Sequence, residues 1–493
     1  MTDTARVVVE PLSVACAPAA AVVSFARGGD AAILESSCLD KSYGRFSVFC
    51  AEPVEVWQAS RDGGASHPPD AFPGVVECPI AAFAERSQRL PDAVAPRGWS
   101  GFAGGWVGYL GYEAGLGFER LRSTARWEAD VPLLRFGLCD AAGVYDHVAG
   151  QWYAVAVDWA GTRGPDRPAV GRRLADVRQR LREAQGYEDG PVARPVGRVG
   201  VRPNLSAEAY AAAVGRALEY IRAGDIYQVN LTQRFRAHTT ETPLTIYRRL
   251  RQTNPATYGG LLLWQGGRRA VLSSSPELFL HVSGDRVVTR PIKGTRPRSG
   301  GADADARRRK ELATSEKERA ELNMIVDLLR NDLGRVCEFG TVRVLDPGCI
   351  EEWATVFHRV ATIEGRLRPG THWLDLLAAT FPGGSITGAP KIRALQIIDE
   401  LEPTARGPYC GALGYIGLDG ALCLNVAIRT IVQVDSAVDI HAGGAIVAES
   451  TPQREYEEVL AKARGMFEAV GCTAPGAEVV PAWSASAQAE VPA

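Results

Sequence analysis

One segment, residues 290–298, restricts how this chain can fold more than any other. The β-branched run at residues 287–289 leads into it and predicts a strand. Pro291 and Pro297 bracket the segment. Because proline has no N–H to donate, we expect the segment neither to continue as a ladder strand nor to enter a helix. Gly294 would let the backbone approach a ligand closely.

Lys293 stands in the middle of this segment, and two interpretations of it are open. A lysine at the end of an apolar strand can be desolvated, which lowers its pKa and frees the amine as a nucleophile. The alternative is a basic loop in solvent, because three arginines share the segment. Taken alone, so short a motif favours the solvent-exposed loop.

Composition narrows the class of protein. The 493 residues are 46% hydrophobic and 23% charged, which is typical of soluble globular proteins. The net charge of −2 predicts no nucleic-acid partner, and no apolar run is long enough to predict a membrane span. The 10 cysteines show no metal-binding spacing, and the first residues do not resemble a signal peptide. We therefore expect a cytoplasmic protein with reduced cysteines.

By composition the chain divides into four parts: an N-terminal region (1–185), a Gly/Pro/Arg-rich linker (186–203), a C-terminal domain with the candidate catalytic residues (204–470) and a disordered tail (471–493). Expected strands lie at residues 7–9, 31–34, 46–50, 104–109, 152–157 and 226–231, and expected helices at 170–184, 206–222, 302–336 and 452–469. Asp419-Gly420 predicts a two-residue hairpin turn.

Glu277 follows the predicted strand that contains Ala270, Val271 and Leu272. Two strands joined through the Gly284-Asp285 turn would bring Glu277 and Lys293 to one end of a sheet. A carboxyl group beside an apolar strand can stay protonated and act as a general acid. The alternative is an exposed glutamate at a turn.

Glu321 borders the apolar stripe of one predicted helix, and Glu458 lies on the last helix, one turn before Lys462. Carboxylates from two helices suit an Mg²⁺ ion that also binds water and a substrate carboxylate. The alternative is a surface glutamate and an ordinary i,i+4 pair.

Arg429 alternates with Ile428 on a predicted strand, where a buried guanidinium needs an anion or an internal ion pair. Both partners remain open. The run from His441 to Ala445 can present backbone N–H groups to an anion, or it can be a tight strand exit.

Taken together, these segments resemble the chorismate-utilising enzymes from about residue 206 to 467. The resemblance is carried by the blocks at 224–231, 274–277, 291–298, 327–334, 381–391, 411–415, 427–430, 442–450 and 457–464. The resemblance implies an α+β fold like that of anthranilate synthase component I, in which two packed sheets form a large twisted antiparallel β assembly flanked by helices.

Two positions place the chain within that family. Relatives that add water to chorismate carry lysine where this chain has Gln228. Anthranilate synthases typically carry alanine where this chain has Lys293, and the synthase component of 4-amino-4-deoxychorismate synthase carries lysine. The resemblance therefore implies that Lys293 attacks chorismate C2 while Glu277 protonates the departing 4-hydroxyl group, and that ammonia then adds at C4 and releases the lysine. His358 would lie near the ring.

The same resemblance implies ligands for the substrate and a cofactor. Mg²⁺ would be held by Glu321 and Glu458. The substrate carboxylates would be bound by Gly294, Thr295, Tyr409, Arg429, Gly443, Gly444, Ala445 and Lys462. The family usually has glycine at position 445, and a backbone contact from Ala445 requires a negative φ.

N-terminal blocks of the chain resemble a tryptophan pocket of the family. That pocket would be lined by Ser36, Tyr43, Gly44, Arg45, Phe46, Thr257, Tyr258 and Gly259. The alternative for these residues is core packing between two sheets.

The expected function is the amination of chorismate with ammonia to 4-amino-4-deoxychorismate, towards 4-aminobenzoate and folate. The alternatives are anthranilate formation and a non-catalytic, chorismate-binding regulatory subunit. No glutaminase nucleophile block is present in the sequence, so a separate glutamine amidotransferase is the expected source of ammonia.

Overall fold

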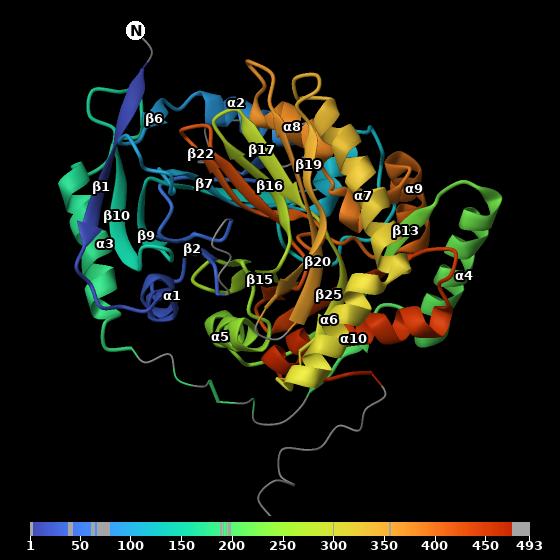
Figure 1. The fold of residues 1–493 in the computed structure, drawn as a ribbon. Helices are drawn as coiled ribbons and strands as arrows, with labels where there is room; N and C mark the ends of the chain where they lie inside the picture. The colour runs from blue at the N-terminus through green and yellow to red at the C-terminus, as the bar shows by residue number, and fades with distance from the viewer. Residues whose placement is uncertain are drawn as a thin grey trace, which may run out of the picture.

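The computed structural model describes residues 3–37, 43–60, 65–66, 79–187, 190, 192–193, 195, 199–298, 300–353 and 356–475. The expected tail lies outside these residues from position 476 onward, as do several positions of the expected linker. Two large sheets dominate the described part of the chain (Figure 1).

The first sheet has 13 strands, and its ladders are antiparallel except between β1 and β6. In order across the sheet these are β12 (Arg202–Pro203), β13 (Gln228–His238), β25 (Ala437–Ile446), β24 (Thr430–Val434), β15 (Arg269–Ser275), β14 (Tyr258–Trp264), β2 (Ala31–Glu35), β3 (Phe46–Ala51), β9 (Ala141–Asp146), β10 (Gln151–Asp158), β1 (Thr4–Leu12) and β6 (Asp92–Val94), with β21 (Gly388–Ala389) beside β13.

The second sheet has 11 strands, all paired antiparallel. In order these are β18 (Ile292–Pro297), β20 (Val356–Arg366), β17 (Arg286–Arg290), β16 (Leu278–Ser283), β23 (Leu422–Val426), β22 (Ala412–Gly417), β7 (Gly105–Leu110), β8 (Leu134–Cys139), β4 (Val56–Ala59) and β5 (Ala65–Ser66), with β19 (Arg343–Glu352) beside β20. A short parallel pair joins β11 (Val199–Gly200) to β26 (Cys472–Thr473).

Helices cover the outer faces of the sheets. Those on the first sheet are α1 (Pro18–Ala26), α3 (Val170–Glu183), α4 (Ala207–Ala223), α5 (Pro243–Thr253), α9 (Lys391–Leu401) and α10 (Pro452–Val470). The helices α6 (Ala302–Thr314) and α7 (Glu316–Gly334) pack on β18, β19 and β20, while α2 (Pro79–Gln88) and α8 (Trp373–Thr380) contact each other. Two 3₁₀ turns are η1 (Tyr112–Gly117) and η2 (Gly384–Ile386).

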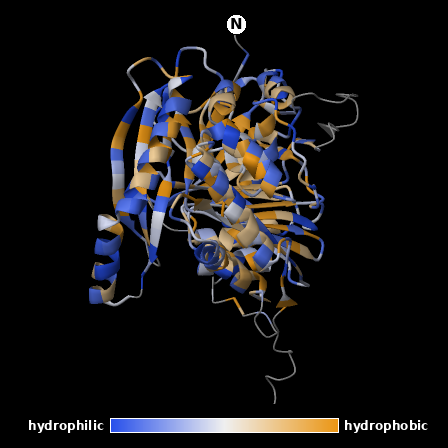
Figure 2. Cartoon of the chain, turned by 90° about the vertical axis from the view of Figure 1, so that its right-hand side faces the viewer, coloured by the Kyte–Doolittle hydropathy of each residue, from blue (hydrophilic) through white to orange (hydrophobic). Residues whose placement is uncertain are grey.

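Between the sheets lies one continuous core. The Tyr109 ring of β7 lies 6.4 Å from the Trp264 ring of β14, so the inner faces of the two sheets meet there. Figure 2 shows hydrophilic and hydrophobic residues alternating along strands, as expected for sheets with one face buried. The predicted architecture of two packed, mostly antiparallel sheets flanked by helices is confirmed.

Several local predictions are also confirmed. The Ser206 side chain accepts a hydrogen bond from the Ala209 N–H and caps α4, and Gly224 ends that helix in the left-handed conformation. Asp419-Gly420 joins β22 to β23. Pro452 begins α10 in the first turn, where its missing N–H has no helical partner.

Several predictions about local structure are wrong, and two of them concern whole segments. Residues 292–297 do form a strand, β18, which pairs with β20 through a register shift between Ile292 and Thr295. Pro291 comes just before the strand and Pro297 ends it, so neither proline prevents pairing, and Gly294, with φ of +87°, lies in the register shift. The helix expected at 302–336 is two helices, because Ser315 is extended and its side chain caps α7.

In each sheet the strands from residues 1–185 lie together on one side and those from the later part of the chain lie on the other. The two groups meet where β2 pairs with β14 in the first sheet and where β7 pairs with β22 in the second. Among the described residues, no helix is long and apolar enough to cross a membrane.

Candidate active site

The candidate site lies where the chain passes twice from one sheet to the other. Ser275 ends β15 in the first sheet and Leu278 begins β16 in the second, so Glu277 occupies the first crossing. Val426 ends β23 and Thr430 begins β24, so Arg429 occupies the second. Backbone bonds hold the crossings together, since the Val426 N–H donates to the Glu277 carbonyl (3.1 Å).

Glu277 and Lys293 lie at the same end of the second sheet, as the sequence predicts. Leu278 on β16 pairs with Arg290 on β17. Glu277, just before β16, is therefore close to the segment with Lys293, just after β17. The Glu277 side chain is buried, which rules out the exposed-turn alternative. Burial raises the pKa of Glu277 to about 7, although the Ser385 side chain, the Lys293 ammonium and the Ile292 N–H all act to lower it. A glutamate with this pKa can hold a proton near neutral pH, as a general acid requires.

The Lys293 side chain is half-buried, and its Nζ lies 3.4 Å from the Ser385 carbonyl oxygen. Burial lowers the pKa of Lys293, the Glu321 carboxylate raises it, and the Lys462 ammonium lowers it again. The pKa of Lys293 ends below its usual value, which favours the neutral amine. The solvent-exposed basic loop is therefore not the environment of this lysine.

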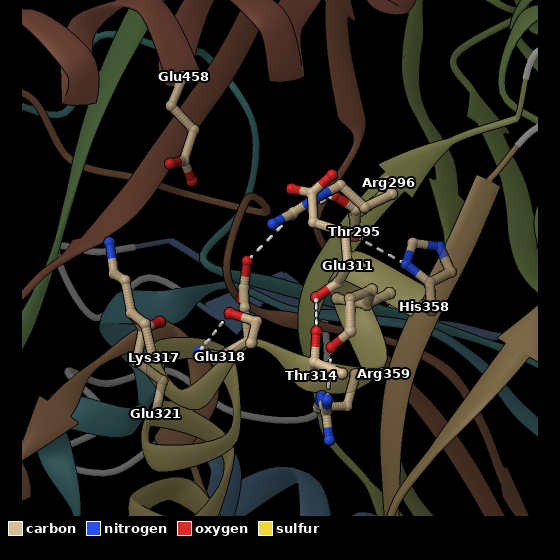
Figure 3. Close-up of polar contacts among 12 residues, drawn as sticks. Thr295, Arg296, Glu311, Thr314, Lys317, Glu318, Glu321, His358, Arg359 and Glu458 are labelled. Atoms are coloured by element: carbon tan, nitrogen blue, oxygen red, sulfur yellow. Dashed lines mark hydrogen bonds and ion pairs between the residues drawn. The ribbon is translucent and has the colours of Figure 1, made fainter. Parts of the chain in front are cut away.

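Beside Lys293, the next two residues of β18 are fixed by neighbours on other elements. The Thr295 hydroxyl lies 2.8 Å from His358 Nδ1, as Figure 3 shows. Burial lowers the pKa of His358 to about 3, so its imidazole is neutral at physiological pH. Gly294 has φ of +87°, which favours glycine, and a Cβ atom there would lie 2.8 Å from both a Glu318 carboxylate oxygen and the Leu312 side chain.

Arg429 is not on a strand, contrary to the prediction. It lies in the crossing between β23 and β24 with φ of +52°, a conformation set by the crossing rather than by the β pattern. In the described part of the chain it forms no ion pair, although it is half-buried. Its charge lowers the pKa of His358, and Tyr409 lies near enough to raise the pKa of Arg429 against the lowering by burial. A guanidinium without a carboxylate partner in such surroundings suits an anionic ligand.

The backbone from Gly443 to Ala445 lies on β25, where β24 no longer covers one edge because that ladder stops at Ile440. Gly443 lies opposite Thr232, whose N–H donates to Glu402 instead of β25. The polar groups of Gly443 therefore face away from β13, and its carbonyl accepts from Lys462 Nζ (2.9 Å). Because residues two apart on a strand point their N–H groups the same way, the Ala445 N–H also faces away from β13. The φ of Ala445 is not positive, so its side chain does not prevent the expected backbone contact.

Glu321 on α7 and Glu458 on α10 approach from two helices. Figure 3 shows the Glu458 side chain pointing toward the turn of α7 that carries Lys317 and Glu321. Each carboxylate already faces an ammonium group: Glu321 lies 3.8 Å from Lys317, and Glu458 lies 2.7 Å from Lys462. Burial raises the pKa of Glu321. It would do the same for Glu458, but Lys462 brings that pKa below its usual value.

These carboxylates fit Mg²⁺ as two oxygen ligands whose remaining partners would be water and substrate oxygens. No cluster of three or more His, Cys, Asp or Glu side chains able to hold a metal occurs among the residues that the structure describes. An Mg²⁺ ion held by this pair would need its other ligands from water or a bound carboxylate.

Ser385 and Asn230 are contacts to this site that the sequence did not reveal. Asn230 Nδ2 donates to the Ser385 carbonyl (2.9 Å), the same oxygen that faces Lys293. Gln228 is two residues earlier on β13 and so shares a face with Asn230. Its side-chain amide is fully buried, and neither its oxygen nor its nitrogen has a hydrogen-bond partner within the described structure. The only sequence feature that could have indicated Ser385 was the Gly-Gly-Ser run within the family-like block 381–391.

A separate cavity of about 240 Å³ lies between the sheets. Its lining includes seven of the eight residues expected in a tryptophan pocket, namely Tyr43, Gly44, Arg45, Phe46, Thr257, Tyr258 and Gly259. Ser36 is not in the lining, and its N–H donates to the Ser47 hydroxyl. The guanidinium of Arg290, three residues before Lys293, lies 4.5 Å from the centre of the Tyr43 ring.

The chain is similar to known proteins over most of its length. The model of the chorismate binding enzyme family matches residues 53–468. Anthranilate synthase component 1 of Thermus thermophilus is 44% identical over 397 residues, covering 80% of this chain and 82% of the relative. Aminodeoxychorismate synthase component 1 of Salmonella typhimurium is 35% identical over 433 residues, covering 88% and 91%.

The crystal structure of anthranilate synthase component I from Streptococcus pneumoniae has a TM-score of 0.73 and 30% identity, covering 86% of this chain and 92% of that one. Both the sequence match and the shared fold extend over most of the chain. The chain therefore belongs to the chorismate binding enzyme family and is a chorismate-utilising enzyme.

Proposed function

We propose that this chain aminates chorismate with ammonia to give 4-amino-4-deoxychorismate. The single observation that carries the proposal is the amine of Lys293 beside the buried carboxyl group of Glu277. An alanine at position 293 would leave no amine on β18. A lysine with a lowered pKa, next to a proton donor, supports a covalent route.

The proposed reaction has two displacements, each with a balanced proton. Lys293 Nζ bonds to chorismate C2, the ring double bonds shift, and the C4–O bond breaks as Glu277 gives its proton to the leaving oxygen, which departs as water. Ammonia then bonds to C4, the double bonds shift back, and the C2–N bond breaks. Glu277 takes up the proton that the incoming nitrogen loses, so the enzyme returns to its starting state.

Gln228 supports ammonia as the nucleophile. A buried amide with a free oxygen and a free nitrogen can bind ammonia, but it cannot take a proton from water as an amine base would. Ammonia needs no such base, because it attacks as the neutral molecule.

The substrate carboxylates would be bound at the second crossing and along the open edge of β25. Arg429, beside Tyr409, offers a guanidinium with no ion-pair partner among the described residues, and Gly443 and Ala445 offer N–H groups. Lys462 and the backbone of Gly294 and Thr295 would complete the binding set, with neutral His358 against the ring. We propose that Glu321 and Glu458 hold Mg²⁺, which would neutralise and orient the ring carboxylate.

Anthranilate formation is the second candidate, and the 44% identity with an anthranilate synthase component 1 favours it. Lys293 distinguishes the two candidate functions, because anthranilate formation by direct attack of ammonia at C2 needs no amine at position 293. For either product, we propose that a glutamine amidotransferase subunit supplies the ammonia. The cavity beside Tyr43 is proposed to bind tryptophan, with Tyr258 and Phe46 as aromatic walls.

The test is product analysis. The chain is incubated with chorismate, Mg²⁺ and an ammonium salt, with and without an added aminodeoxychorismate lyase. The expected result is a product that the lyase converts to 4-aminobenzoate. Fluorescent anthranilate formed without lyase would establish the second candidate instead, and no consumption of chorismate would leave a non-catalytic binding subunit. Lys293→Ala is the matched control, because its C4 amination should be lost.

A further inference from the structure

A cavity of about 260 Å³ lies at the edge of the first sheet, where β12 pairs with β13. Four arginines contribute to its lining, namely Arg126, Arg202, Arg234 and Arg236. The described residues that line it differ from those of the cavity beside Tyr43, whose walls include aromatic rings. The basic lining points to a ligand of a different chemical class.

The pairing of β12 with β13 explains why three of these arginines meet. Arg234 and Arg236 are two residues apart on β13, so their side chains share one face of the sheet. Arg202 on β12 lies directly opposite Arg236, which places its side chain on that face as well. Phe235 faces the other way, because its ring lies 5.2 Å from the Phe467 ring on α10. The sheet therefore gathers three guanidinium groups on the face away from α10.

Two carboxylates neutralise part of this charge. Asp439 lies opposite Arg236 on β25 and accepts two hydrogen bonds from its guanidinium, at 2.7 and 2.6 Å. Glu128, in the segment between η1 and β8, accepts a hydrogen bond from Arg234 at 2.8 Å. Arg234 and Arg236 are therefore each held in place by a carboxylate.

The other two arginines keep their donors available. Arg202 is exposed, and its side chain forms no hydrogen bond or ion pair among the residues that the structure describes. The Arg126 side chain is 74% exposed and lies 3.9 Å from Glu128, beyond the length of a hydrogen bond. Four guanidinium groups thus face two carboxylates, Glu128 and Asp439, which leaves a surplus of two positive charges. Like charges placed directly opposite on neighbouring strands destabilise a sheet unless an anion offsets them.

We propose that this cavity is a binding site for a small oxyanion with two negative charges, of the phosphate or dicarboxylate class. Two negative charges would balance the surplus. A planar guanidinium presents parallel N–H groups to two oxygens of a phosphate or carboxylate, so Arg126 and Arg202 can bind such an ion directly. Arg234 and Arg236, already held by carboxylates, add positive charge beside it. The site is separate from the proposed active site, and the inference does not depend on the proposed function.

The test is isothermal titration calorimetry of the full chain with inorganic phosphate and with malonate. Titrations are run at pH 8, where both ions are doubly charged, and at constant ionic strength set with sodium chloride. Arg126→Gln and Arg202→Gln change exposed side chains, and each should raise Kd about 3- to 10-fold. The double variant should raise Kd about 10- to 100-fold. Arg222→Gln is the matched control, because it removes another exposed arginine, on α4, and should leave Kd unchanged.

Arg429→Met separates this site from the proposed active site, where an anion could also bind. The binding that the Arg126→Gln/Arg202→Gln chain loses should persist in Arg429→Met, and thermal melts check that each variant is folded. Tighter binding of phosphate would identify a phosphate-type ligand for the site, and tighter binding of malonate a dicarboxylate. The proposal is overturned if neither ion binds the wild-type chain, if the folded double variant binds as tightly as the wild type, or if folded Arg429→Met binds neither ion.

Discussion

Replacing Lys391 by methionine tests how the segment that carries Ser385 is held. Lys391 Nζ lies 2.5 Å from Asp332 on α7 and donates to the Thr380 carbonyl (3.0 Å) at the end of α8. The two side chains of the ion pair are only 10% and 5% exposed. Lys391 thus links the two ends of the segment 381–390 to each other and to α7. The Lys391→Met variant would leave the buried Asp332 carboxylate without its cation.

The expected magnitude follows from that burial. Removing one partner of a buried ion pair typically costs about 3–5 kcal/mol of the free energy of unfolding. With an unfolding entropy of about 2.1 cal/mol/K per residue, a chain of 493 residues that unfolds as one unit should lose about 3–5 °C in Tm.

The loss should depend on pH. Burial already raises the pKa of Asp332 even though Lys391 lowers it, and without Lys391 that pKa rises further. A carboxyl group with a folded pKa above its unfolded value binds its proton more tightly in the folded state, so it destabilises the protein increasingly as the pH rises. The penalty of Lys391→Met should therefore be smallest in acid and largest above neutral pH.

Thermal unfolding followed by circular dichroism between pH 5.5 and 8.5 measures both effects. Adding Asp332→Asn to Lys391→Met removes the buried charge and should restore most of the lost Tm at pH 8.5. Arg330→Met is the control, because it breaks an exposed pair with Asp327 and should cost about 0–1 kcal/mol. A Lys391→Met protein with wild-type Tm at pH 8.5, or with a larger loss in acid, would refute the reasoning.

The remaining predictions concern the site. Wild-type protein quenched with chorismate and no ammonia should carry an adduct in its intact mass, and Lys293→Ala should not; an equal yield in the variant would place the nucleophile elsewhere. Glu321→Gln and Glu458→Gln should each raise the Mg²⁺ concentration needed for half-maximal activity by at least about tenfold, since one charged ligand is lost. Glu316→Gln, exposed on the same helix as Glu321, should leave that concentration unchanged, and unaltered Mg²⁺ titrations in both test variants would remove the pair from the site. Glutamine should support turnover only with an added amidotransferase, and turnover of glutamine by the purified chain would contradict the need for that partner.

Local chemistry explains which parts of the fold the sequence predicted. The Ser206 cap, the Asp419-Gly420 turn and the Pro452 helix start each depend on a few neighbouring residues, so the sequence states them directly. The pairing of Glu277 with Lys293 was also predictable, because a short hairpin joins the two strands between them. The motif blocks then identified the family from residue types at their spacing.

Only the tertiary structure decided the features that depend on distant segments. β18 forms because it can pair with β20, which lies about 60 residues later in the chain, and a register shift at Gly294 makes that pairing possible. Arg429 leaves the strand because the chain crosses between sheets there, a geometry that the alternation of residues does not encode. The Ser385 carbonyl meets Lys293 because hydrogen bonds from Arg406 and Asn230 hold η2 against β13. The sequence by itself determined the family and the residues able to do chemistry, while packing between remote elements determined which of them meet and which pKa values shift, since burial and neighbouring charge are properties of the folded chain.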